Sequence, residues 1–239
     1  MVPFSFSGKE MHLVDGRAVF WPDERALLVA DLHLEKASFF ARGGQMLPPY
    51  DSRETLERLA LAIRATGARR VFALGDNFHD DDGARRLDPH AAGMLAALTR
   101  AVEWVWIAGN HDRQLRQIDG GETVAQLAVA GAMLRHKAMA GETLAEFSGH
   151  FHPRLRLAAK GRRVARPCAV MSETRLILPA FGTLTGGLDA ADPAILEAMQ
   201  PARSIDAIVP VAGRALHYPL WRAAACRQQP QGILPGLSG

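Results

Sequence analysis

Three short apolar runs in the first half of the chain each end at a glycine or a carboxylate. Residues 25–30, 70–74 and 104–108 are rich in aliphatic and aromatic side chains, and the polar residues that follow them include Asp31 and Asp76. Such punctuated runs are typical of strands that are buried on both faces. The pattern therefore predicts three strands with polar side chains gathered at their carboxyl ends.

Two helical patterns separate these runs. Residues 51–67 carry an apolar stripe at helical spacing and begin with Asp51 or Ser52 as the expected N-cap. Residues 88–102 form a second predicted helix, with Pro89 in its first turn. The resulting β-α-β-α-β order favours ligand binding at the carboxyl ends of the strands.

The second half of the chain changes to short strands with few helices, one of them at residues 193–199. The predicted strands are residues 132–136, 143–148, 162–171, 175–180, 206–211 and 214–218. Two stacked sheets with helices outside would accommodate both halves, which predicts an α/β (α+β) fold, a two-sheet β-sandwich flanked by helices. We expect one domain over residues 1–226 and a flexible tail over residues 227–239, which are rich in Pro, Gly and Gln.

The composition is that of an ordinary globular protein, with 48% hydrophobic and 22% charged residues and a net charge of +3. Cys168 and Cys226 indicate reduced thiols and no disulfide framework. No apolar run approaches the roughly 18 residues of a membrane span, and the first residues lack a signal-peptide pattern. We therefore expect a cytoplasmic protein with no membrane partner.

The mild positive charge permits nucleic-acid binding without arguing for it. Nearly all the basic residues are arginine. Arginine is well suited to phosphate recognition, but a GC-rich genome would produce the same preference.

Four polar clusters need a joint explanation: Asp31-x-His33, Gly75-Asp76, residues 109–112 (GNHD) and residues 149–153 (GHFHP). Each cluster alone is a common sequence, because a glycine and an aspartate after a strand usually form a turn. Together they offer carboxylate, imidazole and amide ligands, which suit a pair of first-row divalent ions such as Mn²⁺, Fe²⁺ or Zn²⁺. Alternation along an extended segment would place Asp31 and His33 on one side, and likewise His150 and His152.

In this order, the clusters resemble the D-x-H, G-D, G-N-H-D and G-H-x-H motifs of the calcineurin-like metallophosphoesterase family, with His136 as its isolated histidine. The resemblance extends from Asp31 to His152 and implies a two-sheet sandwich flanked by helices. The sequences GDNFHD, GHFHP and LPAFGTLTGGLD (residues 178–189) are closer to the bacterial ligase-associated DNA-damage-response endonucleases. That subfamily implies DNA as a substrate, with an ATP-dependent DNA ligase, a helicase and an exonuclease-like protein as partners.

The resemblance also implies two divalent ions, expected to be Mn²⁺, with Fe²⁺, Zn²⁺ or Mg²⁺ as alternatives. The residues implied for the first ion are Asp31, His33, Asp76 and His152. Those implied for the second ion are Asp76, Asn110, His136 and His150, so Asp76 would bridge the pair. The assignment of His136 depends on order and spacing alone, and an ordinary buried histidine is the alternative.

The resemblance places His111 at the substrate, where an imidazolium would protonate the departing oxygen. Asp112 would either orient His111 or cap a helix. His79 occupies the position where the family usually has a second aspartate. This difference disfavours direct binding of a metal by His79. It favours a contact of His79 with a metal-binding residue or with the substrate. Residues 80–82, all aspartate, are expected in a solvated loop.

A basic segment follows the last metal motif at once, since residues 154–166 contain six basic and no acidic side chains. The residues expected to contact a phosphate backbone are Arg154, Arg156, Lys160, Arg162 and Arg163. A solvated hairpin is the alternative. Arg113, directly after the GNHD motif, is a further expected contact to the scissile phosphate. No aromatic platform for single-stranded nucleic acid is evident in the sequence.

These observations favour a divalent-metal-dependent phosphodiesterase, an endonuclease that hydrolyses DNA in repair. The enzymatic alternative is a phosphoesterase for a small nucleotide, a lipid or a phosphoprotein, because the metal motifs are common to all these activities. An alternative of another class is a scaffold for a ligase and a helicase with weak catalysis. The complete set of ligands disfavours the scaffold.

Overall fold

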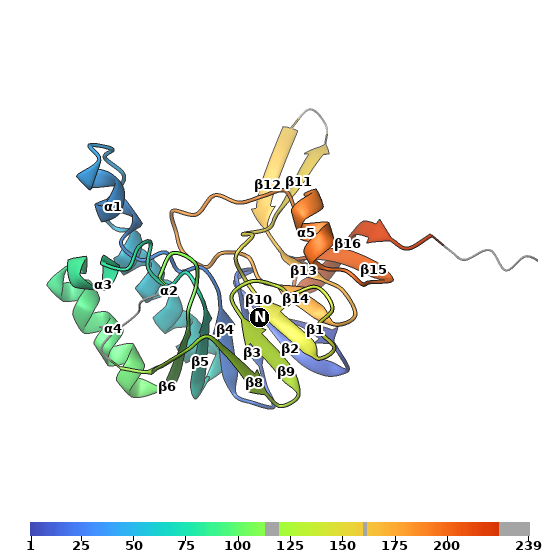
Figure 1. Cartoon of the computed structure of the whole chain (residues 1–239), viewed down its shortest axis with the longest axis horizontal. Helices are drawn as coiled ribbons and strands as arrows, with labels where there is room; N and C mark the ends of the chain where they lie inside the picture. Colours follow the sequence, from blue (N-terminus) through green and yellow to red (C-terminus); the bar gives the residue numbers. More distant parts are fainter. Residues whose placement is uncertain (113–119, 160–161, 225–239) are drawn as a thin grey trace, which may run out of the picture.

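Two seven-stranded sheets lie face to face in the computed structural model, which describes residues 1–112, 120–159 and 162–224 (Figure 1). In spatial order, the first sheet consists of β1 (Val2–Phe6), β2 (Lys9–Val14), β3 (Ala18–Trp21), β4 (Ala26–Val29), β5 (Arg70–Leu74), β6 (Glu103–Ile107) and β7 (Glu122–Val124). The second consists of β16 (Arg214–Arg222), β15 (Ser204–Val211), β13 (Ala169–Met171), β14 (Arg175–Ile177), β10 (Ala145–Ser148), β9 (Ala132–Arg135) and β8 (Gln126–Val129). The predicted two-sheet sandwich is confirmed.

Strands β4 to β7 run parallel, and β4, β5 and β6 are buried over almost their whole length. Leu28 of β4 packs in the apolar cluster between the sheets, whereas Leu27 and Val29 pack in the cluster that the helices share. Burial on both faces explains why these strands are continuous apolar runs. Because the strands are parallel, their carboxyl ends lie at the same edge of the sheet.

The helices flank the sandwich on both sides (Figure 1). They are α1 (Lys36–Arg42), α2 (Asp51–Thr66), α3 (Gly83–Arg86), α4 (Pro89–Ala101) and α5 (Pro193–Ala198). Leu59 of α2 and Leu95 of α4 join the cluster on the outer face of the first sheet, and Ile195 of α5 packs against the second sheet. The two long helices and α5 were predicted, whereas the helices α1 and α3 and the strands β1 to β3, β7 and β8 were missed.

The two residues expected to cap α2 hold a different segment. Tyr50 occupies the N-cap, so the prediction of Asp51 or Ser52 as the cap is wrong. The backbone N–H of Ala37 donates to Oδ2 of Asp51 at 3.0 Å, and that of Glu35 donates to Oγ of Ser52 at 2.8 Å. These side chains therefore fix the start of α1 against the start of α2.

A hairpin of β11 (Arg154–Ala159) and β12 (Arg162–Pro167) projects from the sandwich (Figure 1). The predicted strand at residues 162–171 is thus two strands, β12 and β13, with Cys168 between them. Cys168 has no exposed surface, and burial raises the pKa of its thiol to about 12. That thiol is therefore neutral and inert at physiological pH.

Several expectations fall outside the described residues: Arg113, Lys160, Cys226 and the tail at 227–239. The division into one domain and a flexible tail stays a prediction. Among the described residues, no helix has the length and apolar character to cross a bilayer.

Candidate metal centre

The loops that follow the strands of the two sheets meet at one place. The backbone N–H of Asp31, after β4, donates to the carbonyl of Gly75, after β5, at 3.1 Å. The N–H of His33 donates to the carbonyl of Asp76 at 2.9 Å. The second sheet joins through His150, after β10, whose N–H donates to Oδ2 of Asp31 at 2.9 Å. Backbone hydrogen bonds thus bring the predicted motifs together.

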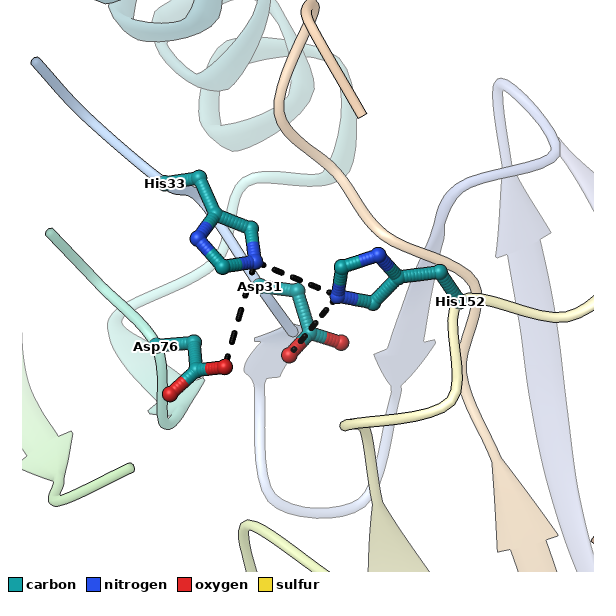
Figure 2. Close-up of side chains that lie close together, drawn as sticks. All are labelled: Asp31, His33, Asp76 and His152. Atoms are coloured by element: carbon teal, nitrogen blue, oxygen red, sulfur yellow. Dashed lines mark hydrogen bonds and ion pairs between the residues drawn. The ribbon is translucent and has the colours of Figure 1, made fainter. Parts of the chain in front are cut away.

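A first cluster of possible ligands consists of Asp31, His33, Asp76 and His152, each offering an atom within 4.8 Å of the others (Figure 2). Nε2 of His33 lies 3.2 Å from Nε2 of His152 and 3.9 Å from Oδ2 of Asp76. Nε2 of His152 lies 3.5 Å from Oδ1 of Asp31. Asp31, His33 and Asp76 are buried and His152 is half-buried, so the cluster is shielded from bulk water.

A second cluster consists of Asp76, His136 and His150, and the exposed Asn110 adjoins it. Oδ1 of Asn110 lies 2.9 Å from Nε2 of His136 and 2.9 Å from Nδ1 of His150. Nε2 of His136 also lies 3.5 Å from Oδ1 of Asp76. Asp76 therefore turns one carboxylate oxygen toward each cluster, which is the geometry that a bridging ligand requires.

The donor atoms in both clusters are spaced as ligands of a shared cation are. A metal bonded at about 2.0–2.1 Å to imidazole nitrogen separates neighbouring ligand atoms by roughly 3 Å. The facing nitrogens of His33 and His152, at 3.2 Å, match this separation, as do the contacts of Asn110. The residues present therefore fit two divalent ions, with oxygen and nitrogen ligands that suit Mn²⁺, Fe²⁺ or Zn²⁺.

His136, which order alone suggested, lies in the second cluster with its ring fixed. Its Nδ1 lies 3.0 Å from the carbonyl oxygen of Leu74, at the end of β5. Because a carbonyl only accepts, Nδ1 carries the proton, and Nε2 is left with a lone pair. This lone pair faces the same space as the acceptor oxygens Oδ1 of Asn110 and Oδ1 of Asp76, where a cation would be bound. This is the arrangement of a metal-ligating histidine more than that of an ordinary core residue.

Most of the expected ligands have strained backbones. The left-handed φ angles are 54° at Asp31, 44° at His33, 49° at Asp76, 74° at His150 and 49° at His152. Residues with a Cβ adopt such angles at a cost, and they concentrate at functional sites. The expectation that Asp31 and His33 converge through alternation of an extended segment is wrong, because both residues lie in a turned loop held by backbone bonds.

Three motif glycines are required by close packing around the ligands. A Cβ added at Gly75 would overlap the ring of His136, and one at Gly109 would overlap the backbone and carboxylate of Asp76. At Gly149, an added Cβ would lie 2.6 Å from a neighbouring side chain. The glycines therefore allow the three loops to approach one another.

Burial favours the neutral form of three histidines in the site, namely His33, His79 and His150. Burial, followed by the proximity of His152 and Lys36, lowers the pKa of His33 to about 2. Burial and then Lys36 lower the pKa of His79 to about 4, and burial and then His136 lower the pKa of His150. A neutral imidazole is the form that binds a metal.

His111 and His79, predicted at the substrate and beside the ligands, stack on each other with ring centroids 5.1 Å apart. Nδ1 of His111 lies 3.0 Å from the carbonyl oxygen of His79, and Nδ1 of His79 lies 3.4 Å from Nδ1 of His33. The His111 side chain is 41% exposed, and its Nε2 lies 4.0 Å from Asp76. His111 thus presents Nε2 at the accessible edge of the clusters.

Asp112 is buried, and its carboxylate accepts backbone N–H groups. The donors are Gly109 at 2.8 Å, Asn77 at 2.6 Å and Phe78 at 3.2 Å. Burial raises the pKa of Asp112, and these three hydrogen bonds oppose that rise. We therefore interpret Asp112 as a residue that ties two loops together, while the carbonyl of His79 orients the ring of His111.

Asp80 differs from the expected solvated aspartate. It is half-buried and accepts hydrogen bonds from Nη1 of Arg86 at 3.0 Å and from its Nη2 at 2.5 Å. Arg42 of α1 lies 3.9 Å from the same carboxylate. Asp80 therefore joins α1 to α3, whereas Asp81 and Asp82 are exposed as expected.

The segment at residues 178–189 braces the site, a role that its sequence did not indicate. The N–H of Phe181 donates to the carbonyl of Ala30 at 2.8 Å, and that of Gly182 donates to the carbonyl of Asp31 at 3.2 Å. Nη1 of Arg58 donates in turn to the carbonyl of Phe181 at 2.9 Å. In the sequence of residues 178–189, the apolar residues and the glycines were the only signal for this bracing role.

Four of the basic residues expected to contact nucleic acid lie in the two strands of the projecting hairpin, Arg154 and Arg156 in β11 and Arg162 and Arg163 in β12. Nη2 of Arg154 donates to the carbonyl of Ala165 at 3.2 Å, and Nη2 of Arg156 donates to that of Gly187 at 3.1 Å. Arg163 is exposed, and it lines an open hollow with Arg156. Arg162 is the first residue of β12.

The chain is similar to one protein family and to several solved structures. A model of the calcineurin-like phosphoesterase family matches residues 24–209. The structure is similar to the nuclease MPE of Pseudomonas putida, with a TM-score of 0.69 and 27% identity over 90% of this chain and 98% of that chain. It also resembles Yfce, a phosphoesterase from E. coli, with a TM-score of 0.39 and 17% identity over 76% of this chain and 86% of that chain. No curated protein sequence matches the chain.

The family match spans both ligand clusters and most of the chain. Its members' name implies a phosphoester hydrolase, and the family implies divalent metal ions, for which the two Asp/His clusters provide ligands. The similarity to the nuclease supports the closer resemblance to the endonuclease subfamily. The chain belongs to the calcineurin-like phosphoesterase family.

Proposed function

We propose that this protein is a phosphodiesterase that cleaves DNA with two divalent metal ions, expected to be Mn²⁺. The observation that carries the proposal is the pair of ligand clusters that share Asp76. Two such sites side by side suit the hydrolysis of a phosphate ester. The similarity to a nuclease over 90% of the chain supports a nucleic acid as the substrate, and the resemblance to the DNA-damage-response endonucleases favours DNA.

The mechanism assigns separate tasks to the side chains. When bound, the ions would acidify a water molecule and neutralise charge on the phosphate oxygens. Asp76 would hold both ions through its two oxygens. Because Nδ1 of His111 is bonded to a carbonyl oxygen, Nε2 is the atom from which this ring can protonate the departing oxygen. Such general acid catalysis contributes about 10²–10⁴-fold to a rate.

The basic hairpin would guide the rest of the DNA. Its first residue, Arg154, comes two positions after the ligand His152. Arg156 and the exposed Arg163 lie farther along the same hairpin. Arginine at this place suits contact with phosphate oxygens, which adds affinity that falls with salt. In the proposed function, these contacts and those of Arg113, Lys160 and Arg162 position the backbone and do not read its sequence.

A substrate panel tests the proposal. Purified protein with Mn²⁺ is given a phosphomonoester, bis-p-nitrophenyl phosphate, a cyclic nucleotide, and linear and circular DNA. We expect cleavage of the diester and of DNA, including the circular form, which an endonuclease can open. Preferential cleavage of monoesters with intact DNA would instead favour a small nucleotide, a lipid or a phosphoprotein as the substrate.

Two variants test the assignment of the residues. His111→Ala should lower the rate about 10²-fold or more while the protein retains its metal. Asp76→Asn should lose metal and activity together, because this carboxylate serves both clusters. The matched control is His90→Ala on the exposed start of α4, which should retain full activity.

We further propose that the enzyme acts in DNA repair in the cytoplasm, with an ATP-dependent ligase, a helicase and an exonuclease-like protein. The support is the resemblance to the ligase-associated subfamily together with the nuclease similarity. In cells treated with a DNA-damaging agent, Asp76→Asn should fail to restore survival while still binding these partners. Full rescue by Asp76→Asn would support a scaffold whose catalysis is dispensable.

A further inference from the structure

Two aromatic side chains, Phe39 exposed and Phe40 half-buried, lie beside the histidines of the metal centre. Phe39 and Phe40 belong to α1, which begins three residues after His33. Phe39 is 39% exposed, although an aromatic ring of this size is usually buried. Helix α1 projects from the body of the molecule (Figure 1). The proposed chemistry gives these rings no task.

The two rings contact His79, which in turn stacks on His111, the residue proposed to protonate the departing oxygen. The ring centroid of Phe39 lies 4.7 Å from that of His79, and that of Phe40 lies 5.4 Å from it. On its other side, His79 stacks on His111 at 5.1 Å, with the planes 22° apart. Phe39 is thus two ring contacts away from the atom that faces the departing oxygen.

Helix α1 is held firmly enough to present these rings. Its start is bonded to Asp51 and Ser52, as described above. In its first turn, Oγ of Ser38 accepts a hydrogen bond from Nε of Arg86 at 3.0 Å. The helix is therefore fixed to both α2 and α3, and Phe39 can meet a ligand without first being ordered.

The surroundings of the rings suit a nucleotide. Phe39, Phe40 and Arg42 line an open hollow at the end of α1. The Arg42 side chain is 62% exposed, and the nearest carboxylate, Asp80, is already paired with Arg86. An aromatic face for a base therefore adjoins a guanidinium for a phosphate, which is the combination found in proteins that bind unstacked bases.

We propose that Phe39, supported by Phe40, binds the base of the nucleoside on the leaving side of the scissile phosphate. This inference rests on the proposed function. The leaving side follows from the geometry, because the rings extend outward from His111, which faces the departing oxygen.

The test uses a short oligonucleotide with one cleavable phosphodiester and methylphosphonate linkages elsewhere. The nucleoside on either side of that bond carries a base or is abasic, and the product ends show which side leaves. For the wild type, an abasic leaving nucleoside should lower kcat/KM about tenfold, a typical effect of losing one stacked base. Phe39→Ala should lower kcat/KM for the intact substrate about tenfold and leave that for the abasic substrate unchanged.

Two variants accompany Phe39→Ala. Phe39→Tyr keeps the aromatic face and should restore the preference for the base. Tyr218→Ala is the matched control, because Tyr218 is also 39% exposed but lies in β16 of the second sheet. It should keep the wild-type preference. Melting temperature and bound metal are measured for every variant to show that α1 and the metal centre are intact.

The outcomes separate the two proposals. If the wild type cleaves no oligonucleotide but hydrolyses other phosphoesters, the proposed function fails, and the base site fails with it. If the oligonucleotide is cleaved and Phe39→Ala retains the full preference for a base, the base site alone is overturned. The base site would also be overturned if the preference depended on the base of the nucleoside that does not leave.

Discussion

At the scale of single residues, Asp112 shows how a carboxylate in a metal motif can serve structure. Its three backbone hydrogen bonds join the loop after β6 to the loop after β5. The bonded groups include Gly109, whose neighbour Asn110 approaches the second cluster. An unpaired buried N–H is costly. Asp112 therefore maintains the distance between two motifs without touching the phosphate.

Substitution of Asp112 tests this interpretation. Asp112→Asn offers one acceptor oxygen and no charge, so we expect a loss of about 1–3 kcal/mol in the free energy of unfolding. Metal affinity should fall because Asn110 and Asp76 shift, while the pH dependence that His111 gives to the rate should remain. Urea unfolding and metal titration provide the measurements. Asp82→Asn, at a side chain 62% exposed, is the control and should be neutral. A changed pH profile in Asp112→Asn would contradict the interpretation.

The neutral histidines of the site predict how the metal-free protein responds to acid. The pKa of His33 is about 2 and that of His79 about 4, both below the ordinary value of 6.5. Below pH 6.5 the unfolded chain therefore binds protons that the folded chain does not, and the free energy of unfolding must fall. We expect this fall to begin near pH 6.5 and to continue to about pH 4, the pKa of His79, as measured by urea unfolding in EDTA.

A substitution isolates the histidine contribution. His79→Gln should reduce the slope of unfolding free energy against pH over that range, and the part due to His33 should remain. His90→Gln, at an exposed position of α4, should leave the slope as in the wild type. An equal slope in the His79 variant and the wild type would show that the acid sensitivity has another origin.

At the scale of elements, the sequence predicted what is locally encoded and missed what depends on contacts. The strands β4 to β6 were predicted because burial on both faces makes them continuous apolar runs. Helix α1 was missed, since its seven residues include two phenylalanines and it has no side-chain cap. Asp51 and Ser52 hold it from another helix. A local pattern cannot contain such a contact.

The site shows the same division. The residues that motif order suggested as ligands, including His136, lie together in two clusters, because they follow the ends of strands in the two sheets. The reason offered for the convergence of Asp31 and His33 was wrong, because the loop is turned and not extended. Nothing in the sequence indicated that Phe39 would contact His79, since that contact depends on how α1 is anchored.

The bracing segment at residues 178–189 supplies a test with an internal control. A Cβ at Gly182 would overlap the carbonyl oxygen of Leu32, and one at Gly187 would overlap that of His152. Both carbonyls belong to loops that carry metal ligands. Gly182→Ala and Gly187→Ala should therefore lower the melting temperature and the metal affinity. Gly186→Ala is the control, because nothing lies within 4 Å of its Cβ position. If all three variants bind metal equally, the segment does not brace the site.

At the scale of the whole molecule, the metal centre joins the two sheets. Asp31 and Asp76 follow strands of the first sheet, whereas His136, His150 and His152 follow strands of the second. The apolar cluster between the sheets already holds them together. Because the expected ligands come from both sheets, metal binding requires the assembled sandwich. Metal binding and folding are therefore coupled.

This coupling predicts that metal stabilises the whole fold and that Asp76 controls the effect. With free Mn²⁺ at 100 times its Kd, the free energy of unfolding should rise by about 2.7 kcal/mol for each site. For a chain of this length, each kcal/mol corresponds to about 2–4 °C in melting temperature. His150→Ala and His152→Ala each alter one cluster and should retain part of the shift, whereas Asp76→Asn alters both and should abolish most of it. His12→Ala, in β2 and away from the clusters, should keep the full shift. Because the bridging role requires Asp76 to matter more than either histidine, equal losses in the three variants would contradict it.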